Sequence, residues 1–192
     1  MKETKKTSIK SKILSFLREL FIVFIGVTAA FVISSRAEKT QQNTLKKNVL
    51  DVIKQEQTSN VGRIKIALKA NKLMLANYDT IIEKLGSPNS SITIHVNKSI
   101  FNDMGFDLAV QSRILSTLHF DVFKDISWCY KLQKSTIELE SAYTNFLNGN
   151  NKTLSSTAER RVYYMKAQNL LRDVIRSLEM QQKDSQSLID KL

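Results

Sequence analysis

The sequence predicts an all-α protein: a single N-terminal transmembrane helix that continues into a long helix, then an antiparallel helical bundle of about three main helices. Three observations predict this fold class. The 192 residues include one proline and five glycines, so long stretches lack helix-breaking residues. An apolar run lies near the N-terminus. Further along the chain, apolar residues recur at three- and four-residue steps, which is typical of helices buried on one side.

The apolar run is long enough to cross a membrane. Leu20 to Ile33 contains no charged residue, and the stretch from Ile13 to Ser35 would be about 34 Å long at ~1.5 Å per residue. A hydrocarbon core is about 30 Å thick. We therefore predict a basic cytoplasmic tail over residues 1–12, a transmembrane helix over 13–35 and a helical extramembrane domain over 36–192.

Spanning requires the charged pair Arg18 and Glu19 to lie near one interface, where arginine can extend toward the headgroups. The predicted membrane anchor comprises Arg18, Glu19, Leu20, Phe21, Ile22, Val23, Phe24, Ile25, Gly26, Phe31 and Ile33. Two alternatives remain open. One is a cleaved signal peptide whose small-residue site ends at Ala37. The other is a buried core helix, although the run has no polar face.

Charge around the run predicts its orientation. More cations precede the apolar core than follow it closely, which favours a cytoplasmic N-terminus in a bacterial inner membrane and an external C-terminal domain. The preceding cations are Lys2, Lys5, Lys6, Lys10, Lys12 and Arg18, and the following ones are Arg36, Lys39, Lys46 and Lys47.

A long helix is predicted over about residues 37–85, which contain no proline and one glycine. Its seam from Val61 to Ile82 has heptad-like spacing, with Asn71 filling one step. An earlier stripe that includes Val49 and Ile53 is out of phase with that seam. A stutter or bend near Thr58 to Gly62 is the expected cause. The seam packs either on its own chain or in a self-associating coiled coil.

The remaining helices are predicted at about residues 105–118, 120–147 and 156–190. Residues 86–104 form a loop that contains the turn-rich Gly86–Ser91 and a possible extended segment, Ile92–Val96. The short helix turns Leu108, Ile114 and Leu115 inward. Ser156 and Glu159 form a capping box at the start of the last helix, whose polar C-terminal end is expected to fray or protrude.

These apolar rows predict a helix-packing or partner surface. Most of its residues lie at helical spacing on the long helix, and the others lie on the two later helices. The residues are Val61, Ile64, Leu68, Leu75, Tyr78, Ile82, Trp128, Tyr130, Tyr143, Leu171 and Leu178. Trp128 is expected at the edge of its row.

Residues with catalytic potential do not form a recognisable site. His95 and His119 are interpreted as surface or capping histidines, and Cys129 as a buried structural thiol. Glu138 and Glu140 point in different directions on one helix. Asp103 and Asp107 lack further oxygen ligands for a cation. We therefore expect no catalytic residues, no metal and no cofactor, and we expect a protein that is not an enzyme.

The net charge of +11 raises the question of nucleic acid. Residues 1–19 hold six cations and two carboxylates, a net +4, which leaves +7 spread over helix faces. The densest basic–aromatic patch is Arg160-Arg161 beside Tyr163-Tyr164. It is interpreted as a solvated face unless it joins the lysines between Lys65 and Lys72 in space. Nucleic acid is therefore not the expected partner.

The stretch from Leu17 to Phe31 resembles an uncharacterised family of Bacteroidetes-type single-pass membrane proteins. That family has a glutamate at the start of its membrane helix, an apolar run containing Ile-Gly, and then a long charged helix. A similar succession of a small helix and a second helix occurs from Ser112 to Tyr130. The chain departs from the family at Ile33 to Ala37, where ISSRA replaces an Asn-rich, Trp-containing stretch. The resemblance implies a topology and no mechanism.

Three functions fit these features. The first is a non-enzymatic, membrane-anchored helical scaffold or accessory subunit of a cell-envelope complex. Its expected partners are the lipid bilayer and another membrane or envelope protein, or a second copy bound through the long helix. The second is a ligand-sensing bundle that signals through a partner and has an apolar pocket bordered by Trp128, Tyr130 and Tyr143. The third is a phage-type inner-membrane spanin, which needs an elongated extramembrane part.

Overall fold

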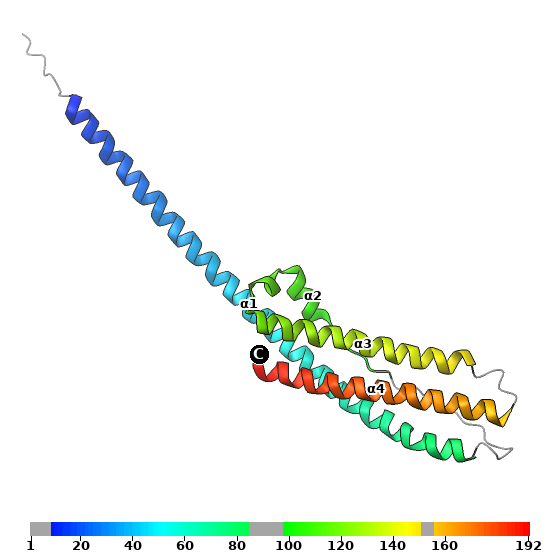
Figure 1. Cartoon of the computed structure of the whole chain (residues 1–192). Coiled ribbons are helices and arrows are strands. Elements are labelled where there is room, and N and C mark those ends of the chain that lie inside the picture. Colours follow the sequence, from blue (N-terminus) through cyan, green and yellow to red (C-terminus); the bar gives the residue numbers. More distant parts are fainter. Residues whose placement is uncertain (1–8, 85–97, 151–155) are drawn as a thin grey trace, which may run out of the picture. The chain divides into compact units, whose positions relative to one another are not determined.

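The computed structural model describes residues 9–84, 98–150 and 156–192, and in these ranges the chain is all-α, as predicted. The elements are α1 (Ile9–Lys84), α2 (Met104–Gln111), the 3-10 helix η1 (Ile114–Thr117), α3 (Phe120–Asn150) and α4 (Thr157–Lys191) (Figure 1). The chain forms two compact units, Met1–Lys47 and Asn48–Leu192. The first unit's described residues all belong to α1, which continues into the second.

Helix α1 contains both the predicted helix over 13–35 and the predicted long helix over 37–85, as far as Lys84, without a gap, in agreement with the predicted fold class. It stays α-helical through Thr58–Gly62, where a stutter or bend is predicted. The out-of-phase positions there are filled by polar residues. Gln57 and Asn60 are fully buried and continue the inward face between Ile53 and Ile64.

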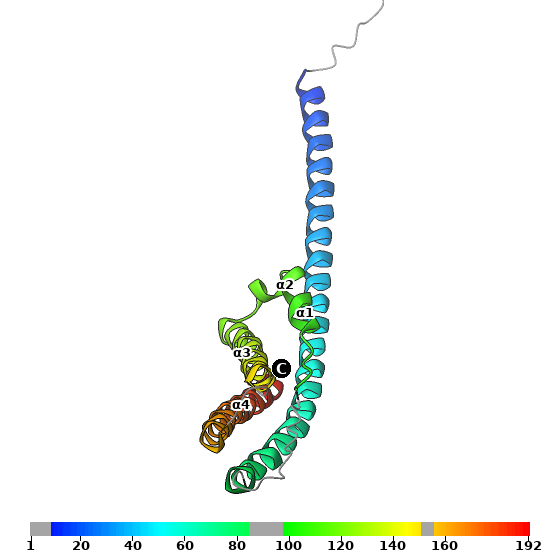
Figure 2. The ribbon, with the colours of Figure 1, turned by 90° about the vertical axis from the view of Figure 1, so that its right-hand side faces the viewer.

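The second unit is a folded-back bundle. Helices α3 and α4 run antiparallel and approach each other closely, and both views place the later part of α1 beside them (Figures 1 and 2). Buried Thr136 of α3 and Ser177 of α4 mark the register of the two helices, because their hydroxyl oxygens are 2.7 Å apart. Near the C-terminus of α4, Lys191 reaches Asp125 of α3.

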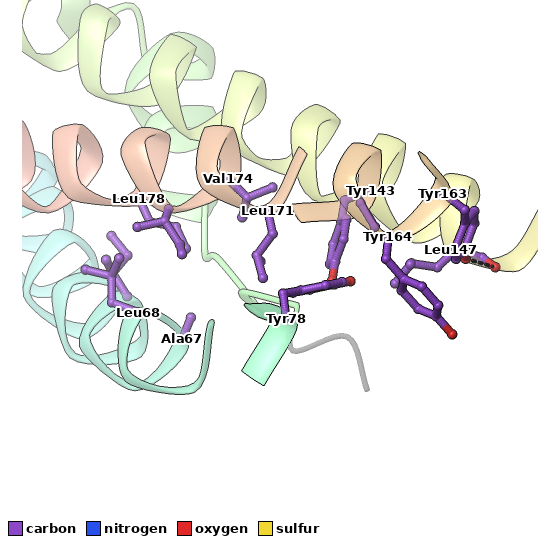
Figure 3. Close-up of a cluster of buried hydrophobic side chains, with 13 residues drawn as sticks. Ala67, Leu68, Tyr78, Tyr143, Leu147, Tyr163, Tyr164, Leu171, Val174 and Leu178 are labelled. Atoms are coloured by element: carbon purple, nitrogen blue, oxygen red, sulfur yellow. Dashed lines mark hydrogen bonds between the residues drawn. The ribbon is translucent and has the colours of Figure 1, made fainter. Parts of the chain in front are cut away.

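The core of the bundle consists of two hydrophobic clusters. One is formed by residues such as Ile64, Tyr78, Tyr143 and Leu171 (Figure 3). The other surrounds Ile53 and lies at the end of the unit where α2, η1 and the C-terminus of α4 meet α1 and α3. Burial of these side chains is the main stabilising contribution to the bundle.

The predicted helix over 105–118 is divided in the structure. Helix α2 ends at Gln111 and η1 follows, with Arg113 between them at a positive φ of 58°. Leu108, expected inward, is 41% exposed, whereas Ala109 beside it is fully buried. Ile114 is buried as predicted, and Leu115 packs against the same cluster.

Helix α4 begins with the predicted capping box, in which Ser156 accepts from the Glu159 N–H and Glu159 accepts from the Ser156 N–H. Its C-terminal end is ordered rather than frayed, because Ser185 and Leu188 are buried against the bundle. The predicted turn Gly86–Ser91 and extended segment Ile92–Val96 lie outside the described residues.

Candidate functional site

The predicted anchor lies entirely on the exposed surface of α1. The large apolar side chains from Ile13 to Ile33 are between 43% and 74% exposed. This part of α1 is long and apolar enough to cross a membrane, and none of its most apolar window is buried within the chain. The core-helix alternative is therefore wrong for this segment. An anchor and a signal sequence near the N-terminus both have this length and composition.

The predicted partner surface on α1 is mostly an internal packing surface. Val61, Ile64, Leu68 and Tyr78 are buried, and Leu75 and Ile82 pack partly buried against the first cluster. Tyr130, Tyr143, Leu171 and Leu178 are also buried. The seam thus packs on its own chain, which leaves it inaccessible to a second copy.

Trp128 is the exception among those predicted residues, because it is 51% exposed. Its indole Nε1 donates to Asp184 of α4 at 2.8 Å. Tyr130 belongs to one hydrophobic cluster and Tyr143 to the other. The three aromatic residues therefore do not border a common pocket in the described part of the chain.

The most elaborate polar arrangement among the described residues holds residues 98–103, a segment without regular secondary structure that we call the strap. Asn60 of α1 binds the backbone of Asn102 twice, donating from Nδ2 to its carbonyl at 2.9 Å and accepting its N–H at 3.0 Å. Gln133 of α3 donates to the same carbonyl at 3.1 Å. Two amide side chains thus provide the hydrogen-bond partners of the Asn102 backbone N–H and C=O groups.

The carboxylate of Glu140 holds the other end of the strap. It accepts the Ser99 N–H at 3.0 and 3.1 Å and the Ser99 hydroxyl at 2.7 Å, while the residue is only 3% exposed. Burial raises the pKa of Glu140, and the hydrogen bonds from Ser99 and the charge of Lys98 oppose that rise. The side chain therefore acts as a structural acceptor.

A second buried carboxylate, that of Glu56, fixes the junction between the strap and α2. It accepts the Gly105 N–H at 2.7 Å and a short hydrogen bond from the Tyr130 hydroxyl. Gly105 lies so close to α1 that a Cβ there would be 3.3 Å from the Ile53 Cα. Burial and the hydrogen bond to Glu56 raise the pKa of Tyr130, so its phenol stays a donor.

Other buried polar groups lie where α1 meets α4. The Ser185 hydroxyl donates to Gln57 Oε1 at 2.8 Å and accepts from Gln181 Nε2 at 3.1 Å. Gln57 Nε2 and Gln181 Oε1 are buried without a partner among the described residues. The Ser185 hydroxyl therefore links the two amide side chains, and each amide keeps one buried polar atom unpaired among the described residues.

The residues considered for chemistry are dispersed. His119 is exposed beside Asp121. Cys129 is buried, and that burial raises its thiol pKa to about 12, which keeps it protonated and unreactive. Within the described ranges no three His, Cys, Asp or Glu side chains are grouped as a metal site would need. Exposed Glu138 and buried Glu140 do not form a pair.

The basic patches also remain separate. Lys72 pairs with Glu179 of α4 at 2.6 Å, which places that part of α1 beside the middle of α4. Arg160 precedes Glu179 by nineteen residues, or about 28 Å of helix at ~1.5 Å per residue. Tyr163 and Tyr164 are buried rather than presented beside the arginines. A continuous phosphate-binding surface is thus not formed from these residues.

No protein family, curated protein or solved structure matches this chain.

Proposed function

We propose that this chain is a non-enzymatic, membrane-anchored helical scaffold or accessory subunit of a bacterial cell-envelope complex. The observation that carries the proposal is the contrast along α1. Its N-terminal part exposes every large apolar side chain from Ile13 to Ile33, and its C-terminal part is built into a bundle. An apolar surface of that size needs a lipid or protein environment.

The proposed topology is a single pass in the inner membrane, with residues 1–12 inside and the bundle outside. It is supported by the six cations before the apolar core and the four that follow it. The resemblance of Leu17 to Phe31 to single-pass membrane proteins supports the same topology. The uncleaved anchor is preferred to a signal peptide because Glu19 interrupts the start of the apolar run.

The non-enzymatic part of the proposal is supported by how the buried polar groups are used. Glu56 and Glu140 bind backbone N–H groups of the chain itself. Cys129 is buried and protonated. A ligand sensor receives less support because its three predicted aromatic residues do not share a pocket, and a spanin because the bundle folds back on itself.

Alkaline carbonate extraction of cell membranes, followed by labelling of an added C-terminal cysteine, tests anchor and topology together. The intact chain should stay in the pellet, and an impermeant maleimide should label the added cysteine in unbroken cells. The unmodified chain is the matched control, because its one cysteine is buried. Release of the intact chain by carbonate would refute the anchor. Labelling only after lysis would show the reverse topology.

The scaffold role predicts a stable partner. Chemical crosslinking in native membranes, followed by purification of the chain in detergent, should recover one envelope protein in reproducible amount. Recovery should persist when the buried thiol is changed by Cys129→Ala, since the proposed role needs no reactive group. A chain that is crosslinked only to abundant bystanders, in proportion to their abundance, would contradict an accessory role.

A further inference from the structure

Among the described residues of the second unit, α1 contributes to an open groove whose lining is mostly apolar and whose charged lining residues are all cationic. We call it the furrow: it is about 420 Å³ in volume and lies between α1 and the strap. Ile66 and Ile100 form its two sides and are 73% and 71% exposed. Its remaining lining residues are Arg63, Ala67, Ala70, Lys98 and Ser99.

The apolar surface continues along α1 beyond the furrow. Leu73 is 67% exposed and follows Ile66 by seven residues, which is two turns or about 10.5 Å at ~1.5 Å per residue. Lys69 is exposed between them on the same face. Two aliphatic side chains with this spacing match the i and i+7 anchors of a helix that lies along the groove.

One of the positive charges at the furrow is held in place by a hydrogen bond. Arg63 donates from Nη1 to the Ile100 carbonyl at 2.7 Å, which fixes its guanidinium at the edge of the groove. Lys98 is exposed one residue before Ser99, which Glu140 anchors. None of the close ion pairs among described residues involves Arg63, Lys69 or Lys98, and the charge of Lys98 also acts on the buried Glu140 carboxylate.

Two other grooves differ in charge. The groove between α1 and α4 mixes Lys65 and Lys183 with Glu179 and Asp190, and is rich in polar side chains. The groove at the other end of the strap contains Glu56 and Asp103. The furrow is therefore the one of these three that combines an aliphatic lining with cations alone, and its charge fits an anionic partner.

We propose that the furrow binds an amphipathic helix of a partner protein, one whose aliphatic stripe lies on Ile66, Ile100 and Leu73 and whose Asp or Glu side chains face Arg63, Lys69 and Lys98. This inference rests on the proposed function, because it assigns the surface by which the accessory subunit holds its partner. A helix fits better than a small amphiphile, since both sides of the groove are open to solvent and the apolar surface extends past it.

A photoreactive benzophenone amino acid in place of Ile66, in the full-length chain in native membranes, tests the proposal. The expected adduct is with one protein, and its mapped peptide should carry aliphatic residues three or four apart beside Asp or Glu. The matched control position is Val162 of α4, which is 53% exposed and lies away from the furrow. It should give no such adduct.

Charge dependence is the second arm of the test. Adding Lys69→Glu and Lys98→Gln should lower the yield of the adduct about fivefold to tenfold, because two rim attractions are lost and one becomes a repulsion. The control substitution Lys166→Glu, at another exposed site, should leave the yield unchanged. Equal melting temperatures of the variants would show that the bundle is intact.

Several results would overturn the proposal: adducts with lipid alone, adducts with a second copy of this chain, a yield no greater than at Val162, or a yield that ignores the charge changes. Failure here is distinguishable from failure of the scaffold role. If the chain still purifies with its envelope protein while Ile66 gives no adduct, the scaffold role stands and the furrow is excluded. If neither is seen in carbonate-resistant protein, both fail.

Discussion

The two parts of α1 reverse the usual relation between polarity and burial. In the first unit, apolar side chains such as Phe24 and Phe31 are 67% and 74% exposed. In the second unit, polar side chains such as Gln57 and Asn60 are fully buried on the same helix. One continuous helix therefore exposes apolar side chains in one part and buries polar ones in the other, and residue type alone does not say which side chains lie inside.

The difference follows from what each part must satisfy. The first part is proposed to cross lipid, where a helix satisfies its backbone by itself and needs only apolar side chains around it. The second part of α1 has to hold a strap whose N–H and C=O groups have no strand beside them. Asn60 and Arg63 supply partners for the strap, and Glu56 supplies one for the Gly105 N–H at the start of α2. Polar residues are therefore buried where the chain itself brings unpaired backbone groups.

The largest effect should come from placing charge in the exposed apolar part. Val23→Asp with Val27→Asp puts two carboxylates near the centre of the predicted span, at about 3 kcal/mol each and about 6 kcal/mol together. We expect the protein to move from the carbonate pellet to the soluble fraction. The matched control is Ile66→Asp with Leu73→Asp, which changes equally exposed apolar residues of the second unit. Equal release by both pairs would contradict the distinction between the two parts.

The second-largest effect should follow the loss of a buried hydrogen-bond acceptor. Glu56→Ala leaves the Gly105 N–H and the Tyr130 hydroxyl without their partner, at a cost of about 3 kcal/mol in the free energy of unfolding. The melting temperature should fall by about 6–12 °C, measured by circular dichroism of the full chain in detergent.

The control for Glu56→Ala is Glu138→Ala, which removes an exposed carboxylate from α3. It should change the melting temperature little, since exposed carboxylates contribute little to stability. If both substitutions had the same effect, Glu56 would not be holding the junction of the strap and α2.

The hydroxyl pair in the first cluster allows a sharper comparison within the bundle. Tyr78 and Tyr143 lie with their hydroxyl oxygens 2.8 Å apart, and burial raises the pKa of both (Figure 3). Tyr143→Phe leaves the Tyr78 hydroxyl unpaired, at about 1–2 kcal/mol in the free energy of unfolding. Tyr78→Phe should cost less, because the Tyr143 hydroxyl still donates to Met74 Sδ at 3.3 Å.

A double-mutant cycle isolates this pair. The double substitution to phenylalanine should cost about 1 kcal/mol less than the sum of the single changes, because no hydroxyl is then left unpaired. Tyr164→Phe is the control, since it removes a hydroxyl outside the pair. Additive effects would mean that the two hydroxyl groups do not depend on each other.

The fold was largely predictable because it depends on local spacing. The apolar run, the steps from Val61 to Ile82 and the capping box at Ser156 each identify an element without long-range information. The division of residues 105–118 was missed because the turn at Arg113 adopts positive φ with a residue that does not favour it.

The polar interior could not be predicted in the same way. The break in the apolar pattern before Val61 was visible, but its cause lies 42 residues away, where Asn102 meets Asn60. A pattern on one helix does not show which distant backbone it contacts. The furrow was missed for the same reason, because its second side is Ile100 of the strap and its first side is an isolated exposed aliphatic, Ile66.

The smallest predicted effect concerns pH and the other end of the strap. Burial raises the pKa of Glu140 above its ordinary value, so the folded protein binds this proton more tightly than the unfolded chain. Stability from this group is therefore present at low pH and declines as pH rises from the ordinary glutamate pKa to the raised one, and then stays constant. Glu140→Gln removes this titration.

The difference in melting temperature between the original chain and Glu140→Gln should therefore become less favourable to the original chain as pH rises through that window. The effect is small because the hydrogen bonds from Ser99 stabilise the charged form and oppose the cost of burial. Ser99→Ala weakens that opposition and should steepen the decline. If the difference in melting temperature instead grew in favour of the original chain as pH rises, the hydrogen bonds from Ser99 would outweigh burial. A fully charged Glu140 would then hold the strap most tightly.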